Sequence, residues 1–373
     1  MANKNAKLFE TLQLGTKTLR NRLAVAPMTR VSGEEDGTVG PLMQEYYESF
    51  ADGGFGLIVT EGLYTDEHYS QGYYRQLGIA TAKQSKSWKP IVKSVQDKGA
   101  ILIAQLMHAG SLSQFNSYTD SSAGPSAVQP MGEQMPFYYG EGNYNVPIAM
   151  SQQDINDVIS GFVQAAEFAK SAGFDGVEIH GANGYLLDQF LTNYSNQRTD
   201  RYGGDITARL HIYQDVIEAV RQAVGNDFIV GVRFSQKKVN DTNHVWPEGE
   251  LAAAKAFGLM RKCQVDYIHT TEPVLNDPAF EQSASLAALA KKYSGLPVIA
   301  NGGVRKPDLA LSVIENQDVD VVTLGRAALA NPDWPTAVRN DVPLKEFDYA
   351  TLAPIANLES AKNHAELKQL GSD

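Results

Sequence analysis

The sequence predicts an α/β protein built as a (β/α)8 TIM barrel, with an N-terminal hairpin and a long insertion after the third barrel strand. Two observations predict this fold: eight short apolar runs recur along the chain, and helical patterns alternate with them. Several runs are continuously apolar, as expected for parallel strands buried on both faces. Repeated strand–helix alternation favours a closed barrel over a six-stranded open sheet.

The expected barrel strands are apolar or β-branched runs bounded by Gly, Pro or polar residues. In chain order they are Leu23–Ala26, Leu57–Thr60, Ile101–Gln105, Gly176–Ile179, Phe228–Val232, Val265–His269, Pro297–Ala300 and Asp320–Leu324. Helical periodicity is expected between them. The helical segments include Ile155–Ala172, Arg209–Val224, Glu250–Lys262, Ser285–Tyr293 and Asp308–Glu315.

Two segments lie outside this alternation. Phe9–Arg20 alternates in polarity around Gly15 and predicts a hairpin, which we expect to close the bottom of the barrel. Residues 111–150 follow the third strand, are rich in Ser, Gly, Tyr and Pro, and are too long for an ordinary connection. They form either a lid over the site or a mobile insertion, and Tyr138 and Tyr139 favour the lid.

Composition and charge suit a cytoplasmic globular enzyme in which residues 1–373 form one domain. The chain is 43% hydrophobic and 20% charged, without a second domain or a low-complexity tract. No apolar run approaches the roughly 20 residues needed to cross a bilayer, and the N-terminus lacks the apolar segment of a secretory signal. With Cys263 as the sole cysteine, an intrachain disulfide and a multi-cysteine metal site are excluded, and we expect no metal. The net charge of −11 disfavours nucleic acid as a partner.

Polar residues follow the ends of most expected strands, where barrel enzymes carry their chemistry. Gly302 and Gly303 would let backbone N–H groups approach an anion without a Cβ atom in the way, and Gly325-Arg326 would add donors and a positive charge. Loops after the seventh and eighth barrel strands often bind phosphate. A phosphate site is therefore predicted; the alternative is that these glycines only make tight turns.

The fourth expected strand leads into the most informative segment, Gly176-Val-Glu-Ile-His-Gly-Ala-Asn-Gly-Tyr-Leu-Leu-Asp-Gln-Phe-Leu191. His180 and Asn183 can both donate a hydrogen bond to a carbonyl oxygen, and the Tyr185 hydroxyl can deliver a proton. Taken singly, each residue has a structural explanation: His180 as a buried core histidine, Asn183 as a turn residue and Tyr185 as a packing aromatic. Their joint spacing at a strand end favours a catalytic group.

In the same order along the chain, these segments resemble the Old Yellow Enzyme family of FMN-dependent ene-reductases, from about Leu8 to Trp334. The resemblance covers Ala26-Pro-Met-Thr-Arg30, Thr60-Glu-Gly62, Gln105-Leu-Met-His-Ala-Gly110, the His180 segment, Gly231-Val-Arg-Phe-Ser235, Asn301-Gly-Gly-Val304 and Leu324-Gly-Arg326. It implies that FMN is bound by Pro27, Met28, Thr29, Gly62, Gln105, Arg233, Asn301, Gly302, Gly303, Gly325 and Arg326.

Side-chain chemistry supports two of these implied roles. The Gln105 amide can both donate to and accept from the pyrimidine edge of a flavin. Arg233 would place positive charge beside N1 and O2, where it stabilises the reduced flavin; the alternative for Arg233 is an ion pair within the barrel. Thr29 would donate a hydrogen bond to the flavin O4, and some relatives carry cysteine at that position.

The implied reaction is hydride transfer from NADH or NADPH, through FMN, to an activated alkene or a quinone. His180 and Asn183 would bind the substrate carbonyl oxygen, and Tyr185 would protonate the α-carbon. The expected partner is a small molecule, with neither nucleic acid nor membrane involved, and the sequence leaves a homo-oligomer open.

Other activities need features that are missing or different here. Dienoyl-CoA reductases of this type add a cysteine-ligated cluster, and tRNA dihydrouridine synthases need a basic surface and a site cysteine. Two alternatives stay open: a non-flavin barrel lyase or aldolase that binds a phosphorylated sugar, and a non-catalytic flavin-binding protein.

Family members often have arginine where Ser111 stands, and Gln-Lys-Lys-Val-Asn after Ser235 departs from the commoner pattern. Both positions border the expected substrate opening.

Overall fold

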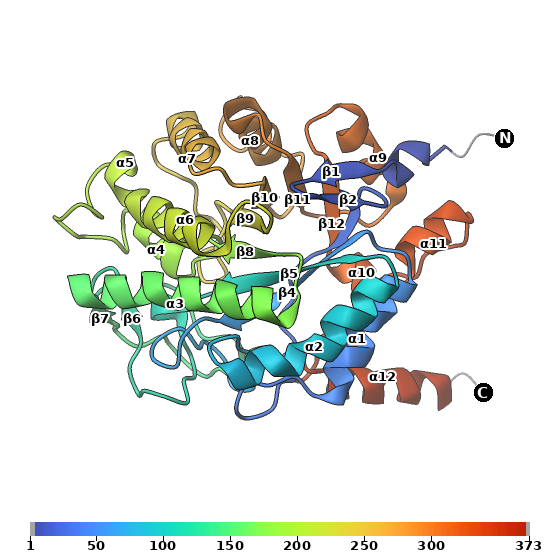
Figure 1. Ribbon diagram of the computed structural model, residues 1–373, viewed down its shortest axis with the longest axis horizontal. Helices are drawn as coiled ribbons and strands as arrows, with labels where there is room; N and C mark the ends of the chain where they lie inside the picture. Colours follow the sequence, from blue (N-terminus) through green and yellow to red (C-terminus); the bar gives the residue numbers. More distant parts are fainter. Residues whose placement is uncertain (1–3, 371–373) are drawn as a thin grey trace.

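The computed structural model describes residues 4–370, and its centre is a closed barrel of eight parallel strands (Figure 1). In chain order the strands are β3 (Leu23–Val25), β4 (Leu57–Tyr64), β5 (Ile101–Met107), β8 (Gly176–His180), β9 (Ile229–Phe234), β10 (Tyr267–Thr271), β11 (Val298–Asn301) and β12 (Val321–Leu324). β12 pairs with β3 and closes the ring. The predicted (β/α)8 fold is confirmed.

The strand bounds differ most from the prediction at β4, which continues through Glu61 and Gly62 to Tyr64. A register shift between Val59 and Gly62 interrupts the β4–β5 ladder. At this irregularity, the Gln105 backbone N–H donates to Oγ1 of Thr60 (3.0 Å) instead. Glycine and a charged residue therefore mark a bulge in a buried strand, where the sequence indicated a strand end.

Helices surround the barrel (Figure 1). They are α1 (Pro41–Asp52), α2 (Ala82–Asp97), α3 (Gln152–Ala172), α4 (Leu186–Leu191), α5 (Ile206–Arg209), α6 (His211–Val224), α7 (Glu250–Lys262), α8 (Leu286–Ser294), α9 (Pro307–Glu315), α10 (Arg326–Ala330), α11 (Trp334–Arg339) and α12 (Leu358–Leu370). Ser151 begins α3 as a capping box with Asp154, and Gly173 ends it with φ 96°. The predicted helix Arg209–Val224 is wrong at its start, because the chain turns at Leu210 between α5 and α6.

The N-terminal hairpin closes one end of the barrel, as predicted. β1 (Leu12–Leu14) pairs antiparallel with β2 (Lys17–Leu19). Leu14 and Leu19 are fully buried in a cluster with inward-facing barrel residues such as Ile101 and Ile229. These apolar contacts exclude water from the amino ends of the strands.

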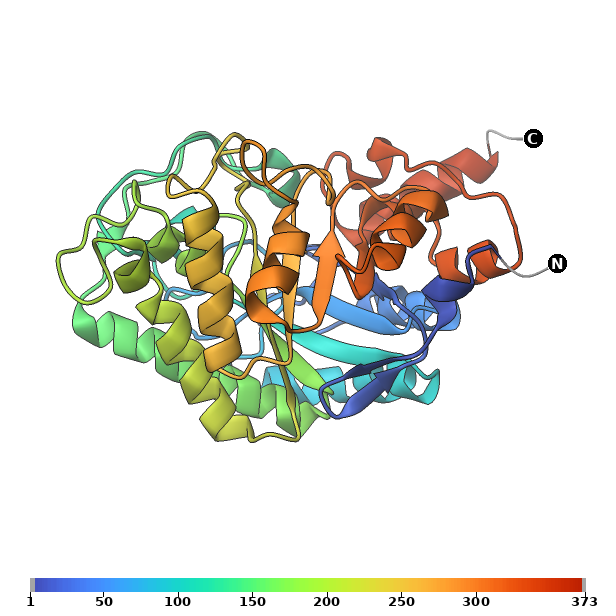
Figure 2. The ribbon, with the colours of Figure 1, turned by 90° about the horizontal axis from the view of Figure 1, so that it is seen from above.

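Residues 111–150 have little regular structure. Their elements are η2, which begins at Gly110 and ends at Leu112, β6 (Ala123–Gly124), η3 (Pro136–Tyr138) and β7 (Ile148–Ala149). Figure 2 shows these blue-green loops and the dark blue hairpin at opposite ends of the barrel. Between residues 4 and 370, no helix is long and apolar enough to cross a membrane.

Candidate active site

The barrel interior carries a ladder of polar side chains, because alternate residues of each strand point inward. Gln105 on β5 is paired in register with Glu178 on β8, and His180, two residues further, is paired with Arg233 on β9. His269 on β10 is also in register with Arg233. Strand register thus gathers side chains that lie far apart in the sequence.

Glu178 is the centre of this interior network and is fully buried. Its carboxylate accepts hydrogen bonds from the Gln105 amide (2.8 Å), the Tyr267 hydroxyl (2.9 Å) and Nδ1 of His269 (2.9 Å). Burial raises the pKa of Glu178, but its interactions with His269, Arg233 and Gln105 outweigh burial and hold that pKa at about 2. Glu178 is therefore a buried carboxylate anion at neutral pH. Sequence reasoning missed it, although a lone acid two residues before His180 in an apolar strand was the available signal.

Arg233 supplies the opposite charge and has unused hydrogen-bonding capacity. Its side chain is 5% exposed, and Nε has no acceptor within the described residues 4–370. A buried guanidinium nitrogen without a partner is costly, and such an atom indicates a ligand that the site is built to receive. The pyrimidine edge of a flavin offers the acceptors that Arg233 lacks, so the donor set fits FMN. Gln105 lies nearby with its amide N–H donated to Glu178, which leaves its carbonyl oxygen as an acceptor.

His180 is oriented as a neutral hydrogen-bond donor. Its side chain is buried, and Nδ1 accepts a hydrogen bond from the Ala182 backbone N–H (3.2 Å). Burial, with the nearby positive charge of Arg233, lowers the pKa of His180 well below its ordinary value. The neutral ring therefore carries its proton on Nε2, because Nδ1 is occupied as an acceptor.

Asn183 is presented by a turn with unusual backbone geometry. Its φ of 61° lies in the left-handed region that non-glycine residues seldom adopt. The Asn183 backbone N–H donates to Oγ of Ser235 (2.8 Å), and its carbonyl accepts from the Val239 N–H (3.1 Å). The side-chain amide makes no hydrogen bond to any other residue in the part of the chain that is described, so it is available to a ligand.

Tyr185 is buried next to His180, with ring centroids 4.9 Å apart at 78°. Its hydroxyl is hydrogen-bonded to the hydroxyl of Tyr73, which is fully buried. Burial raises the pKa of Tyr185 to about 12, although the hydrogen bond with Tyr73 acts in the opposite direction. Tyr185 therefore keeps its proton at neutral pH. Nothing in the sequence pattern singled out Tyr73, because it lies in a loop without periodicity.

The insertion reaches this group of residues from above. Tyr138 packs against Tyr73, with ring centroids 4.9 Å apart, and donates a hydrogen bond to the Thr29 carbonyl oxygen (3.2 Å). Tyr144 is buried in the same apolar cluster as Tyr73 and Tyr185. The insertion therefore contacts this group of residues through Tyr138 and Tyr144, whereas Tyr139 is 41% exposed.

The residues predicted around the flavin ring lie at the same rim. Pro27, Met28 and Thr29 follow β3 and are half-buried. A Cβ atom added to Gly325 would lie 3.6 Å from Sδ of Met28, so the ends of β3 and β12 are adjacent. Gly62 is in register with Gln105. Its Cβ would lie 2.4 Å from the Met107 sulfur, so a side chain at this position would have to displace Met107.

At the predicted phosphate end, packing and backbone geometry already require the glycines, whether or not an anion binds. Gly302 has φ 153° and Gly303 has φ 67°. A Cβ on Gly302 would lie 2.3 Å from the Glu272 carbonyl oxygen, so the close approach of a neighbouring loop excludes a side chain. The tight-turn explanation therefore accounts for these glycines without an anion.

The polar side chains at this end are also occupied within the protein. Asn301 donates to the Thr323 carbonyl (3.0 Å) and accepts from the Thr271 hydroxyl (3.1 Å), which ties three strand ends together. Arg326 donates to the Tyr349 hydroxyl and lies 5.6 Å from the centre of that ring. What these strand ends offer a phosphate is chiefly backbone N–H groups, since the first N–H groups of α10 have no intrahelical acceptor.

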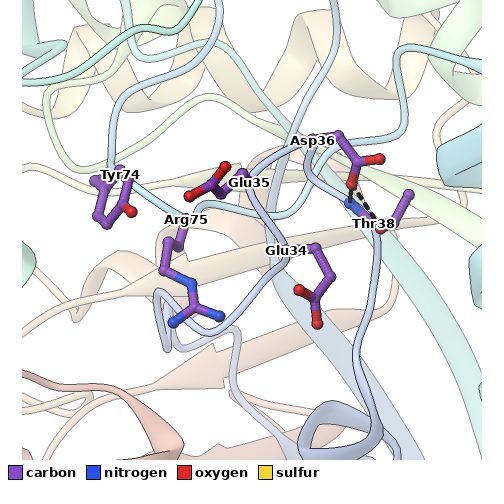
Figure 3. A pocket seen from close by; sticks show the side chains of 6 residues that line it. All are labelled: Glu34, Glu35, Asp36, Thr38, Tyr74 and Arg75. Atoms are coloured by element: carbon purple, nitrogen blue, oxygen red, sulfur yellow. Dashed lines mark hydrogen bonds between the residues drawn. The ribbon is translucent and has the colours of Figure 1, made fainter.

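A separate surface cavity of about 600 Å³ lies beside the loop that carries Tyr73 (Figure 3). It is lined by Glu34, Glu35, Asp36, Thr38, Tyr74 and Arg75. Asp36 forms an ion pair with Lys83, whose hydrogen bond is the main cause that lowers the pKa of Asp36 to about 2. Because Lys83 pairs with Asp36, the cavity keeps two further carboxyl groups, Glu34 and Glu35, against one guanidinium, and this excess of acidic groups is unsuited to a phosphate.

Comparisons with known proteins agree with this geometry. The model of the NADH:flavin oxidoreductase / NADH oxidase family matches residues 7–345. The chain is 35% identical over 345 residues to putative 12-oxophytodienoate reductase 5 of Oryza sativa subsp. japonica, covering 90% of this chain and 88% of that protein. It is 31% identical over 337 residues to an NADH oxidase of Thermoanaerobacter brockii. That match covers 88% of this chain but 50% of the relative, so the chain spans about half of that protein's length.

Solved structures show the same fold over nearly the whole chain. Morphinone reductase in complex with tetrahydroNAD superposes with a TM-score of 0.82 at 31% identity, covering 92% of this chain and 93% of that one. The Old Yellow Enzyme homologue from Zymomonas mobilis superposes with a TM-score of 0.85 at 28% identity, covering 95% and 99%.

Proposed function

The chain belongs to the NADH:flavin oxidoreductase / NADH oxidase family, and from that premise we propose that its barrel end reduces α,β-unsaturated carbonyl compounds and quinones. It is an FMN-dependent oxidoreductase that uses NADH or NADPH, which sets aside both the non-flavin lyase and the non-catalytic flavin-binding protein. The observation that carries the proposal is the juxtaposition of the His180 and Tyr185 rings, 4.9 Å apart, with His180 in register with Arg233 on the neighbouring strand.

In the proposed mechanism, protein groups bind, polarise and protonate the substrate. Bound FMN would supply the hydride-transfer chemistry between NADH or NADPH and the β-carbon of the alkene. Nε2–H of His180 and the Asn183 amide donate hydrogen bonds to the carbonyl oxygen, where negative charge develops. The Tyr185 hydroxyl then gives its proton to the α-carbon. The buried rim excludes bulk water from these groups.

The cofactor site has two proposed parts. Arg233 and Gln105 face the pyrimidine edge, and Pro27, Met28, Thr29 and Gly62 border the ring. Backbone N–H groups around Gly302, Gly303, Gly325 and Arg326 hold the phosphate, with Asn301 as a support for the strand ends. For Arg326 to bind the phosphate, its guanidinium must either leave the Tyr349 hydroxyl or donate to the hydroxyl and the phosphate at the same time.

Noncovalent FMN is the expected cofactor of the purified protein, because the chain has no GxGxxG strand–helix unit for an adenosine diphosphate group. Heat or acid should release all of the flavin, and mass spectrometry should identify it as FMN. Release of FAD, or flavin that stays attached to the denatured chain, contradicts this part of the proposal.

Arg233→Met is expected to lower the reduction potential of the bound flavin and to slow its reduction by NADH or NADPH. A buried positive charge favours the arrival of electrons beside it, and such a charge is worth on the order of a few kcal/mol. The potential is measured by anaerobic dye equilibration on protein with full FMN content. Arg233→Lys, which keeps the charge, is the matched control. Its flavin reduction potential should lie between those of wild type and Arg233→Met. An unchanged potential in Arg233→Met removes the assigned role.

We also propose that this one-domain enzyme works in the cytoplasm. Cys263 is buried, and burial raises the pKa of its thiol to about 12, so the thiol is unreactive. A net charge of −11 does not favour binding to a polyanion. Cell fractionation with antibody detection tests the location.

A further inference from the structure

A buried ion pair lies directly behind the turn that carries Asn183 and Tyr185. Nζ of Lys238 is 2.7 Å from Oδ1 of Asp188, and the two side chains are 3% and 0% exposed. Lys238 belongs to the segment after Ser235 that departs from the commoner family pattern. Ion pairs this deeply buried are costly to desolvate, and the catalytic steps above do not use this one.

The second oxygen of Asp188 contacts the catalytic turn itself. Oδ2 accepts a hydrogen bond from the Gly184 backbone N–H (2.7 Å), and Gly184 lies between Asn183 and Tyr185. The Gly184 carbonyl accepts from the Gln189 amide (2.7 Å). Both peptide groups of Gly184 are thus held by side chains of α4, next to a residue with left-handed φ that needs such support.

The segment that carries Lys238 contacts the other side of the same turn. Asn183 and Lys238 form an isolated parallel bridge, in which the Val239 N–H donates to the Asn183 carbonyl. The hydroxyl of Ser235 accepts from the Asn183 N–H and donates to the Lys237 carbonyl (2.7 Å). The ion pair therefore joins the two segments between which the backbone of Asn183 is held.

We propose that Asp188 is a positioning residue for the carbonyl-binding turn, and that Lys238 is the counter-charge that allows this carboxylate to be buried there. The inference rests on the proposed roles of Asn183 and Tyr185. Asp188 fixes the Gly184 peptide, and this sets the spacing between the Asn183 amide and the Tyr185 hydroxyl. Without Lys238, burial would favour the neutral carboxyl, since burial is the main cause that raises the pKa of Asp188 and the charge of Lys238 opposes it.

Two double variants separate positioning from simple core packing. Asp188→Asn/Lys238→Met removes both charges but keeps an amide oxygen that can accept from the Gly184 N–H. Asp188→Leu/Lys238→Met removes both charges and the acceptor. Replacing both partners of a buried pair is far milder than removing one, so both double variants are expected to fold.

The readout is the dissociation constant of 4-hydroxybenzaldehyde, whose phenolate oxygen can accept from His180 and Asn183, followed by the absorbance of bound FMN. Asp188→Asn/Lys238→Met should bind within about threefold of wild type. Asp188→Leu/Lys238→Met should bind roughly tenfold or more weakly, because a buried N–H then lacks its acceptor. The reduction potential should stay at the wild-type value in both, because Arg233 is untouched.

Asn183→Ala distinguishes failure of this inference from failure of the proposed function. If Asn183→Ala leaves phenolate affinity unchanged, the proposed role of Asn183 is wrong. If Asn183→Ala weakens binding while both double variants bind like wild type, only the positioning role is overturned. The positioning role is also overturned if Asp188→Asn/Lys238→Met loses affinity while its Tm and reduction potential stay at wild-type values. In that case an oxygen that accepts from the Gly184 N–H would not be enough to maintain ligand binding.

Discussion

Tyr185→Phe is expected to slow enone reduction by about 10²–10⁴-fold, the usual contribution of general-acid catalysis, while FMN content and reduction by NADH or NADPH stay close to wild type. The reason is that the Tyr185 hydroxyl is proposed only to protonate the α-carbon, a step that plays no part in FMN binding or in flavin reduction. Quinone reduction should survive, because the protons there go to oxygens that exchange with water. Stopped-flow absorbance of each half-reaction measures the two effects separately.

The pH dependence of the same step follows from the burial of Tyr185. Its pKa is raised to about 12, so the donor form is complete at neutral pH and is lost only as pH rises through that value. Enone reduction should therefore show no loss that is due to Tyr185 until the pH approaches about 12. Tyr73→Phe is the matched control, since it removes the hydrogen bond to Tyr185 but leaves the donor hydroxyl. A Tyr185→Phe variant that reduces enones at the wild-type rate would assign the proton to another group.

His180→Ala is expected to cost about 10²–10³-fold in enone turnover, the range found when one donor to a developing oxyanion is removed. Unlike Tyr185→Phe, it should also weaken the binding of carbonyl and phenolate ligands, because Nε2–H contacts the oxygen before the reaction. His180→Gln keeps an N–H donor of similar reach and should recover part of both losses. Titration with 4-hydroxybenzaldehyde measures the loss of ligand affinity. Unchanged affinity in a fully loaded His180→Ala protein contradicts the assignment.

The sequence predicted the barrel well, because hydrophobic runs and turn residues are local signals. Strands and helices appear where periodicity indicated them, and the hairpin around Gly15 closes the barrel through Leu14 and Leu19. The errors were made where tertiary contacts override local pattern. Glu61 and Gly62 stay within β4 at a bulge, and Leu210 separates Arg209, the last residue of α5, from the helix that was predicted to begin at Arg209.

The site was only partly predictable for the same reason. His180, Asn183 and Tyr185 share one segment, so their spacing was visible in the sequence. Tyr73 bonds to Tyr185 across 112 positions and carried no local signal. Lys238 lies in a segment whose sequence departs from the commoner family pattern. Its ion-pair partner, Asp188, is 50 positions away, so the pairing carried no local signal. Side-chain pairing between loops depends on register and packing, which a single sequence does not display.

The roles of the phosphate residues illustrate a further difference. The glycines at 302 and 303 were expected to admit an anion, whereas steric contact with the Glu272 carbonyl and positive φ already require them. Turn chemistry predicted the tight-turn alternative for these glycines, but the contact with the Glu272 carbonyl oxygen was not predictable, because it joins two separate loops. The charge of Arg326 likewise meets Tyr349 from the C-terminal segment, a contact that strand-by-strand reasoning could not include.

An anaerobic titration followed by visible absorbance tests the central claim most directly. NADH or NADPH should bleach the flavin band of the purified protein, and one equivalent of 2-cyclohexenone should restore it with formation of the saturated ketone. Tyr185→Phe should bleach in the same way and recover far more slowly. A protein that is not bleached by either nicotinamide, or that is bleached but not reoxidised by the enone, contradicts the account.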